Sequence, residues 1–441
     1  MSPTETSGTF HCVFSPPVMS ECTTPELEEA RRNVIEAFRC TKESGTPTVH
    51  TVTFAPLGPR TNADRLASER WDIQGQQWLF LAVCDGHIGT ATSEYTIRTL
   101  PGKLRTALER TLEEKFKGSL ERSNLARIEQ SIGKLLCRET YRFDLDLARA
   151  VKELCPDPRK MSEEEIRLLI EQHGEVFQRA LEGTTLAMAL VNLDLRVVWG
   201  ASVGDSTIAL STKDKEGVHR GRKFCHLHSF KNPREYYETV MRHSSAEKNI
   251  VDQHDKILGW LSLSRAIGDH CLKMPRVYTS RIFQHLPSHR GLPFSALLSR
   301  LHTPPYISAE PSLRFIDLDP FWSHDPTILV YSDGVDNIVD GAMVFTPNVS
   351  SKWGPLFVLP SLLPESARVS SGVEHILGHP VEVGWSREDA NMAVDILGNL
   401  LGGRDAKRLT MVMDRELLTS DSQDVVFHID DVTIIVARLT A

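Results

Sequence analysis

Apolar residues recur along this chain in two patterns, and each pattern predicts a different kind of element. Short runs rich in Val, Ile, Leu, Phe and Trp predict β-strands. Such runs are VHTVTFA, LASERWDI followed by QQWLFLAV, TTLAMALVN, LRVVWGASV, SLRFIDLD, TILVY and VTIIVARL. Gln74 and Gly75 separate the second run from the third, so this pair of runs predicts a hairpin around a glycine-containing turn.

Apolar residues at helical spacing fill most of the regions between these runs. Residues 91–182 are predicted to be mostly helical, and Ser162 followed by Glu165 forms a capping-box pattern at the start of one helix. Shorter helical patterns cover 25–39 and 386–402. The apolar face of the helix that starts at the capping box is expected to pack on another part of the protein.

The order of strand-like and helical regions predicts one large α+β domain with insertions. Residues 1–45 are rich in Ser, Thr and Pro before their helical pattern begins, and they predict an N-terminal extension or an arm packed on the main body. Residues 46–441 contain the strand-like runs and form the predicted domain. Within it, about 91–182 is a predicted helical insert, and about 275–305, rich in Pro, His and Ser, is a predicted loop insert.

Composition and charge narrow the classes of protein. The 441 residues carry a net charge of −8 without a basic run interleaved with aromatics, so we expect no nucleic-acid ligand. No apolar run approaches the roughly 18 residues that cross a bilayer, so we expect no membrane partner. The eight cysteines lack a CxxC pair, and the N-terminus shows no signal-like pattern before Arg31. We therefore expect a cytoplasmic protein, and we expect it to be a monomer.

Aspartates stand at the ends of four strand-like runs. They are Asp85, Asp205, Asp333 and Asp430, and the first three each adjoin a glycine. An Asp-Gly pair after a strand is common in an ordinary turn. Four carboxylates that met at one end of a sheet would repel one another and lose hydration, unless divalent cations such as Mg²⁺ lay between them. The pattern alone leaves both interpretations open, a set of turns and a metal site.

Seven short motifs extend this pattern in a fixed order. They are DGHIG, GTTLA, VGDST, LSRAIGD, AEPSL, SDGVDN and DDVTIIV. Together they resemble the motif series of the metal-dependent protein serine/threonine phosphatases, the PPM or type 2C family, over roughly residues 48–441. The segments HTPPYISAEPS and KNPREYYETV are most similar to the branch that contains the pyruvate dehydrogenase phosphatases, and this leaves mitochondria as the alternative to the cytoplasm. The resemblance implies a central antiparallel β-sandwich flanked by helices, with four layers in the order α-β-β-α.

The resemblance also implies a centre of two Mg²⁺ or Mn²⁺ ions, with a more loosely held third. By motif, Asp85 would bridge the two ions and the Gly86 carbonyl would bind the second. Asp333 and Asp430 would hold the first ion. Asp205, in VGDS, would support the third.

The implied reaction is hydrolysis of phosphoserine or phosphothreonine in a protein substrate. Two metals would neutralise the phosphomonoester and lower the pKa of a water, which then attacks phosphorus without a covalent phosphoenzyme. His87 resembles the family's general acid, which protonates the departing alkoxide. The alternative for His87 is a histidine that orders the water or the loop. Cys84 lies inside a strand-like run and is expected to pack rather than to react.

Departures from the family pattern affect the second metal and the phosphate. The family usually presents Glu-Asp near its N-terminus, where this chain has Ala63 and Asp64. Ala63 cannot bind a cation, so Asp64 or an extra water would have to replace the missing carboxylate. Arg60 lies one residue nearer than the usual phosphate-binding arginine, and surface solvation is its alternative role. Ile88 replaces the glycine that usually follows DGH.

These departures leave two functions open. One is a phosphatase that is active or partly impaired, and the other is a pseudophosphatase that binds phosphoproteins without turnover. Other classes fit less well, because the P-loop pattern around Gly133 and Lys134 is incomplete and the GxSxG nucleophile elbow is absent.

Overall fold

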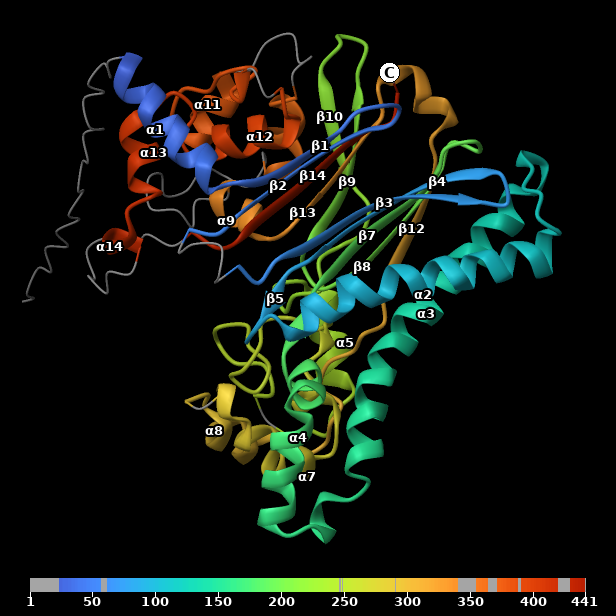
Figure 1. The fold of residues 1–441 in the computed structure, drawn as a ribbon, viewed down its shortest axis with the longest axis vertical. Helices are drawn as coiled ribbons and strands as arrows, with labels where there is room; N and C mark the ends of the chain where they lie inside the picture. The colour runs from blue at the N-terminus through green and yellow to red at the C-terminus, as the bar shows by residue number, and fades with distance from the viewer. Residues whose placement is uncertain are drawn as a thin grey trace, which may run out of the picture.

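Two antiparallel β-sheets stack face to face, and helices cover the outer face of each sheet (Figure 1). The computed structural model describes residues 24–56, 62–245, 247, 249–289, 291–339, 354–363, 371–387, 390–418 and 429–440. The four layers of helix, sheet, sheet and helix confirm the α+β sandwich that the motifs predicted.

The first sheet has six strands, in the order β1-β2-β14-β13-β9-β10. Their bounds are Arg39–Glu43 (β1), Thr48–Phe54 (β2), Val432–Arg438 (β14), Thr327–Tyr331 (β13), Thr207–Lys213 (β9) and His219–Lys223 (β10). Two strands far apart in the chain meet in this sheet, because β14 pairs with β2 along its full length.

The second sheet has five strands, in the order β12-β8-β7-β4-β3. Their bounds are Ser312–Asp317 (β12), Val197–Val203 (β8), Leu186–Asn192 (β7), Gln76–Cys84 (β4) and Arg65–Ile73 (β3). The predicted hairpin of β3 and β4 is confirmed, and Gln74 and Gly75 at its tip have φ of 55° and 76°. Positive φ at both central residues lets a two-residue turn follow the twist of the strands.

Alternation along the strands divides the buried apolar side chains between separate cores. In β4, Leu79 and Leu81 pack between the sheets with Ile435 of β14. The intervening residues Trp78 and Phe80 belong to the core between the second sheet and its helices. Because successive side chains in a strand point to opposite faces, a strand covered on both faces is apolar throughout. This explains the continuous apolar run in QQWLFLAV.

Short helices cover the outer face of the six-stranded sheet. Their bounds are Thr24–Ala37 (α1), Gly334–Val339 (α9), Pro355–Ser361 (α10), Ser371–Leu377 (α11), Met392–Leu401 (α12), Ala406–Met411 (α13) and Arg415–Leu418 (α14). The helix predicted over 386–402 begins later, at Met392, because the Asn391 side chain caps it by accepting hydrogen bonds from the N–H groups of Ala393 and Val394.

Two long helices, Ala91–Phe116 (α2) and Leu125–Leu154 (α3), cover the five-stranded sheet. They begin the helical insert predicted over 91–182, which ends with Glu163–Leu181 (α4). The capping box at the start of α4 is confirmed: Ser162 Oγ accepts from the Glu165 N–H, and the Glu165 carboxylate accepts from the Ser162 N–H.

A helical lobe lies beside the sandwich and has its own apolar core (Figure 1). Besides α4, it contains Pro233–Met241 (α5), His270–Lys273 (α6), Arg276–Arg281 (α7), Phe294–Arg300 (α8) and the 3₁₀ helices Pro158–Lys160 (η2), Phe283–His285 (η3) and Pro287–His289 (η4). The prediction of a loop over 275–305 is therefore wrong. Tyr278, Ile282 and Leu286 are buried at helical spacing in this core, but the Pro, His and Ser around them obscured the pattern.

Two further 3₁₀ helices, Arg122–Asn124 (η1) and Asp319–His324 (η5), lie in connections. Residues 24–43, from the predicted N-terminal extension, form α1 and β1, and β1 pairs with β2 at the sheet edge. Among the described residues, no helix combines the length and apolarity needed to cross a membrane.

Candidate active site

The register of the five-stranded sheet places two acids at the same end of the sandwich. Cys84, the last residue of β4, pairs with Arg65, the first residue of β3. Asp85 follows Cys84 and Asp64 precedes Arg65. Both acids therefore leave the sheet at one edge, although 20 positions of hairpin separate them in the chain.

The six-stranded sheet contributes three more acids. Tyr331, at the end of β13, pairs with Thr207 of β9 on one side and Ile434 of β14 on the other. Asp333 follows Tyr331 by two residues, Asp205 precedes Thr207 by two, and Asp430 precedes β14. The three acids therefore leave neighbouring strands at a common end.

Several of these acids change one another's pKa, as carboxylates that lie close together do. Burial raises the pKa of Asp85 well above its usual range, and the charges of Asp64 and Asp333 raise it further. Burial followed by the charge of Asp333 likewise raises the pKa of Asp205, with a smaller contribution from Asp430. Burial also raises the pKa of Asp333, although its contact with Asp85 lowers it. We call Asp64, Asp85, Asp205, Asp333 and Asp430 the aspartate cluster.

Asp64 is the most buried member of the cluster. Burial raises its pKa to about 7, although hydrogen bonds from Ser332 and Thr433 oppose the shift. Asp64 Oδ2 accepts a hydrogen bond of 2.7 Å from Ser332 Oγ. Asp64 Oδ1 is buried without a hydrogen-bond partner among the described residues. A buried carboxylate oxygen of this kind is costly unless a cation or proton meets it.

Ala63 contributes backbone atoms rather than a side-chain ligand. Its N–H donates to Asp431 Oδ2 at 2.7 Å, and its carbonyl accepts from Ser93 Oγ at 2.8 Å. Burial raises the pKa of Asp431 to about 6, the Ala63 N–H lowers it, and the charge of Asp430 raises it. Asp431 is thus a further acid beside the cluster. The Asp-Asp pair was visible in the sequence, but no role followed from it.

A small three-stranded sheet positions Gly86 and His87. Its strands are Gly86–His87 (β5), Gly183–Thr184 (β6) and Ile267–Gly268 (β11), in the order β11-β6-β5. This sheet brings the DGH, GTT and AIGD motifs together.

His87 contacts an acid from the third of these motifs. His87 Nε2 and Asp269 Oδ2 are 2.7 Å apart, and Asp269 is fully buried. Gly183 lies against this pair, because a Cβ at residue 183 would overlap both His87 Nε2 and Asp269 Oδ2. The motif that contains Asp269 is visible in the sequence. Its contact with His87 is not, because this contact depends on the pairing of three distant segments.

Ile88 and Arg60 are the remaining positions from the motifs. Ile88 has φ of 69°, a left-handed conformation that glycine adopts more easily than a β-branched residue. Arg60 lies outside the described residues.

The chemistry of the aspartate cluster fits hard divalent cations. Mg²⁺ and Mn²⁺ prefer oxygen ligands, and carboxylates that repel one another gain most from a shared cation. The raised pKa values of Asp85 and Asp205 and the unpartnered Asp64 Oδ1 are the observations that support this fit.

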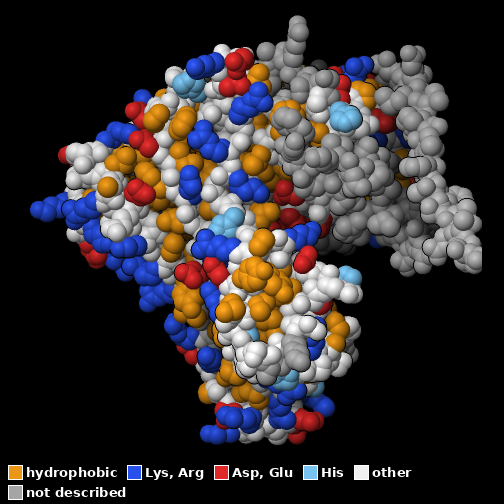
Figure 2. Space-filling view, turned by 180° about the vertical axis from the view of Figure 1, so that it is seen from behind, with side chains coloured by type: hydrophobic (Ala, Val, Ile, Leu, Met, Phe, Trp, Pro, Cys, Tyr) orange, Lys and Arg blue, Asp and Glu red, His pale blue; other side chains and the backbone are white. Residues whose placement is uncertain are grey.

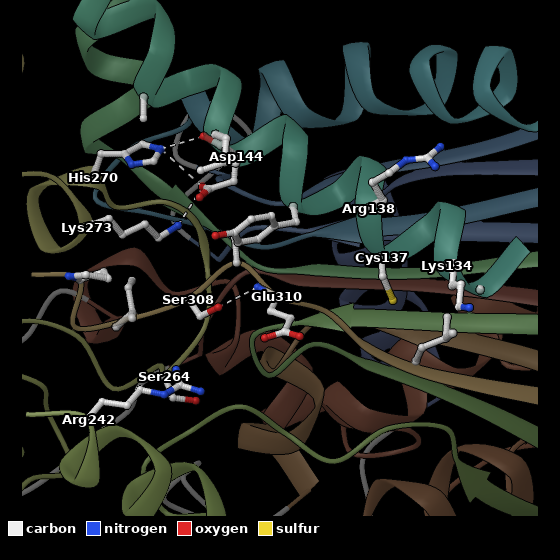
Figure 3. Close-up of a pocket in the computed structure, with 18 of the residues that line it drawn as sticks. Lys134, Cys137, Arg138, Asp144, Arg242, Ser264, His270, Lys273, Ser308 and Glu310 are labelled. Carbon is white, nitrogen blue, oxygen red and sulfur yellow. Dashed lines mark hydrogen bonds and ion pairs between the residues drawn. The ribbon is translucent and has the colours of Figure 1, made fainter. Parts of the chain in front are cut away.

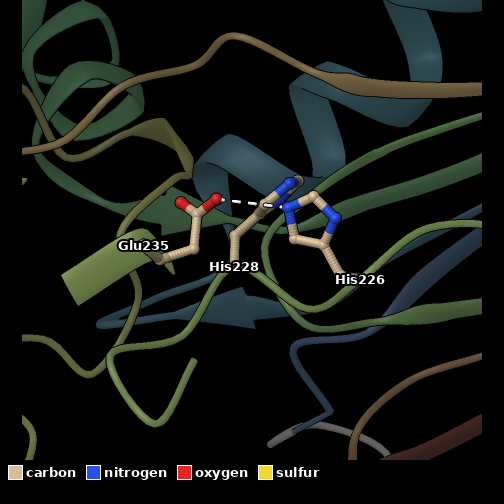
Figure 4. Close-up of side chains that lie close together, drawn as sticks. All are labelled: His226, His228 and Glu235. Atoms are coloured by element: carbon tan, nitrogen blue, oxygen red, sulfur yellow. Dashed lines mark hydrogen bonds and ion pairs between the residues drawn. The ribbon is translucent and has the colours of Figure 1, made fainter. Parts of the chain in front are cut away.

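A second group of metal-ligand residues lies nearby. The ligand atoms of His226, His228 and Glu235 lie within 4.8 Å of one another (Figure 4). However, both Glu235 oxygens accept hydrogen bonds from Arg265, at 2.8 and 3.0 Å. His228 Nδ1 accepts from the Gly204 N–H at 3.1 Å, and His228 Nε2 lies 2.7 Å from Ser312 Oγ. A cation here would face the Arg265 charge, so we interpret this group as a structural network.

Comparison with known proteins shows which family this part of the chain is similar to. Residues 145–345 match the family model of protein phosphatase 2C. This match covers a little under half of the chain, and it confirms the resemblance seen in the motifs.

The relatives differ in how much of each chain is matched. Pyruvate dehydrogenase (acetyl-transferring) phosphatase 1, mitochondrial, of Homo sapiens is 28% identical over 163 residues, which are 36% of this chain and 29% of the relative. This chain thus matches less than a third of that relative's length. A protein phosphatase 2C homolog of Schizosaccharomyces pombe is 24% identical over 264 residues, 60% of this chain and 54% of the relative. The crystal structure of serine-threonine phosphatase 2C from Toxoplasma gondii aligns with a TM-score of 0.46 at 12% identity, covering 91% of this chain and 99% of that chain.

Proposed function

We propose that this protein hydrolyses phosphoserine and phosphothreonine in protein substrates by a metal-activated water, without a covalent phosphoenzyme. The observation that carries the proposal is the aspartate cluster, in which acids from both sheets leave the strands at one end of the sandwich and burial raises the pKa of Asp85 and Asp205. The match of residues 145–345 to the family model of protein phosphatase 2C adds support.

The roles of the cluster follow the motifs. In this proposal Asp85 and the Gly86 carbonyl hold two Mg²⁺ or Mn²⁺ ions, and Asp333 and Asp430 complete the first site. Asp205 supports a third, weaker site. Asp64, whose Oδ1 lacks a hydrogen-bond partner among the described residues, supplies the carboxylate that Ala63 cannot.

His87 and Asp269 control the proton in this proposal. The bound ions supply positive charge to the phosphoryl group and lower the pKa of the attacking water. The Asp269 carboxylate accepts from His87 Nε2–H and holds the orientation of the ring. That hydrogen bond leaves His87 Nδ1–H to protonate the departing serine or threonine oxygen. Arg60 remains the predicted phosphate contact.

Hydrolysis of p-nitrophenyl phosphate and a phosphopeptide in Mn²⁺ tests the proposal. Asp333→Asn keeps the side-chain size but removes a charge from the cluster, so we expect kcat to fall by about a hundredfold or more. The matched control is Asp194→Asn. Asp194 lies in the turn between β7 and β8, at the other end of the sandwich. It is exposed and accepts a hydrogen bond from the N–H of Gln77 in β4. Equal activity of Asp333→Asn and wild type would refute the proposed roles.

Ala63 favours one alternative, a pseudophosphatase that binds phosphoproteins or partners with little or no turnover. Ala63→Glu tests it, because a carboxylate at this position would strengthen the second metal site. If Ala63 only weakens the second metal site, kcat/KM should rise by about tenfold in the variant, or ~1.4 kcal/mol. No turnover by wild type or Ala63→Glu at millimolar Mn²⁺ would favour the pseudophosphatase.

The remaining properties are proposals of the same kind. The partner is a phosphorylated protein, and we propose a monomer in the cytoplasm. Because the human relative is named as mitochondrial, cell fractionation distinguishes the cytoplasm from mitochondria, and light scattering during size exclusion measures the oligomeric state.

A further inference from the structure

A polar pocket of about 600 Å³ lies at the edge of the sandwich, between the end of β10, α5 and the start of β12. We call it the basic pocket. Its lining contains the basic side chains of Lys223, His226, Arg234, Arg242, Arg265 and Arg314, against the carboxylates of Glu238 and Glu310.

Nearby carboxylates are used by only some of these cations. Arg265 forms an ion pair of 2.8 Å with Glu235, and Arg234 forms one of 2.8 Å with Glu238. Burial alone would raise the pKa of Glu235, but hydrogen bonds from Arg265 and Ser264 lower it to about 2. Glu235 therefore stays ionised and pairs with Arg265.

Three cations keep their charge available. Within the described part of the chain, Lys223, Arg242 and Arg314 have no carboxylate at ion-pair distance. Three like charges around one concavity repel one another and create a positive potential that an anion relieves. This positive pocket stands out on a chain whose net charge is −8.

A neighbouring cavity of about 1490 Å³ shows the contrast. It lies between α3 and residues 305–315 and shares Arg242 and Glu310 with the basic pocket (Figure 3). There the buried Asp144 forms an ion pair of 2.8 Å with Lys273, so the negative charge of Asp144 is neutralised within the protein.

The basic pocket lies close to the aspartate cluster. Ser312, which lines the pocket, pairs across the sheet with Ser202 of β8. Asp205 follows Ser202 by three residues, which can span at most about 10 Å, and the chain bends at Gly204. His228 also joins the two regions, because it contacts both Ser312 and the Gly204 N–H. Figure 2 shows basic and acidic side chains mixed over one face of the molecule.

We propose that the basic pocket binds a second anionic group of the phosphoprotein substrate, either a carboxylate or another phosphate, about three residues from the phosphorylated serine or threonine. The proposal rests on the proposed phosphatase function. Three residues of extended peptide span about 10 Å, and guanidinium groups bind carboxylate and phosphate oxygens in the same forked geometry.

Matched phosphopeptides test this proposal. Each carries one phosphoserine and, three residues before or after it, Glu, Gln or a non-hydrolysable phosphonate analogue of phosphoserine. In Mn²⁺, wild type should hydrolyse the Glu peptide with kcat/KM about tenfold above the Gln peptide in one of the two directions. A higher value for the phosphonate than for Glu identifies phosphate as the preferred anion, and the reverse identifies carboxylate.

Charge reversal links the preference to the pocket. The double variant Lys223→Glu with Arg314→Glu should lose the preference, and Lys223→Gln with Arg314→Gln should lose most of it with less perturbation. The control is Lys215→Glu, an exposed lysine in the turn at the other end of β10, which should keep the preference. Hydrolysis of p-nitrophenyl phosphate, which is too small to reach the pocket, should stay unchanged in all variants and reports folding.

The outcomes separate the two proposals. Equal kcat/KM for Glu and Gln peptides in both directions, with p-nitrophenyl phosphate hydrolysed normally, overturns the pocket alone. If wild type hydrolyses no substrate, the phosphatase function fails, and fluorescence anisotropy of labelled phosphonate peptides tests the pocket by itself. Binding that is about tenfold weaker in the charge-reversed variant then supports the pocket, and equal binding overturns it.

Discussion

At the scale of residues, the position of His87 depends on a glycine from another motif. Gly183 lies against His87 Nε2 and Asp269 Oδ2, and a Cβ at this position would overlap both atoms. Two polar side chains in contact cannot both retreat without breaking the 2.7 Å contact between them. The alignment of His87 therefore depends on the absence of a side chain at Gly183.

Gly183→Ala tests this dependence. We expect kcat/KM for p-nitrophenyl phosphate to fall by about tenfold or more and stability to fall by about 1–3 kcal/mol, because overpacking forces neighbours out of place. Gly174→Ala is the control, since a Cβ there would meet no atom within 4 Å and the residue lies in α4. Unchanged activity of Gly183→Ala, measured beside this control, would show that the contact is not needed.

The sequence predicted single residues best where a motif carried them. Asp85, Asp205, Asp333 and Asp430 were visible at strand ends, and the structure brings them together. Asp269 and Asp431 were not assigned, because their roles come from contacts with His87 and the Ala63 N–H, 182 and 368 residues away. Contacts of that range have no signature in local spacing.

At the scale of elements, buried histidines join strands to helices. His50 of β2 accepts a hydrogen bond of 2.8 Å at Nδ1 from the Met392 N–H, at the start of α12. Burial, and then the charge of Lys42, lowers the pKa of His50 to about 4. A protonated Nδ1 could not accept this hydrogen bond, so the fold requires the neutral imidazole.

This requirement makes stability depend on pH. In the unfolded chain the pKa of a histidine is near 6.5, so the unfolded state gains a proton first as the pH falls. The contribution of His50 is complete above pH 6.5 and is lost between pH 6.5 and 4. From pH 7 to pH 5 that loss is about 2 kcal/mol.

Urea unfolding of His50→Asn at both pH values measures the effect. The variant should lose about 2 kcal/mol less stability between pH 7 and pH 5 than wild type does. His324→Asn removes an exposed histidine and should behave as wild type. Identical pH dependence of His50→Asn and wild type would contradict the role of His50.

Elements with strong periodic patterns were predictable, and others were not. The β3–β4 hairpin and the capping box of α4 were read from local residues and confirmed. Strand β1, with the sequence RCTKE, is mostly exposed and has no apolar alternation. It is a strand because β2 offers it an edge to pair with, and this depends on tertiary structure rather than on the segment.

At the scale of the whole molecule, the account depends on two sheets that deliver acids to the same end. Asp64 and Asp85 come from the five-stranded sheet, and Asp205, Asp333 and Asp430 come from the six-stranded sheet. The order of motifs predicted this sandwich through its resemblance to a family. Local patterns could not have done so, because β2 at residues 48–54 pairs with β14 at residues 432–438.

Metal binding measured on the intact protein tests this convergence most directly. Equilibrium dialysis against Mn²⁺, followed by metal analysis, should give about two ions per chain for wild type and for Asp194→Asn. Asp333→Asn should lose at least one ion while keeping its melting temperature without metal. Equal manganese content in Asp333→Asn and wild type, or no bound manganese in wild type at millimolar concentration, would contradict the account.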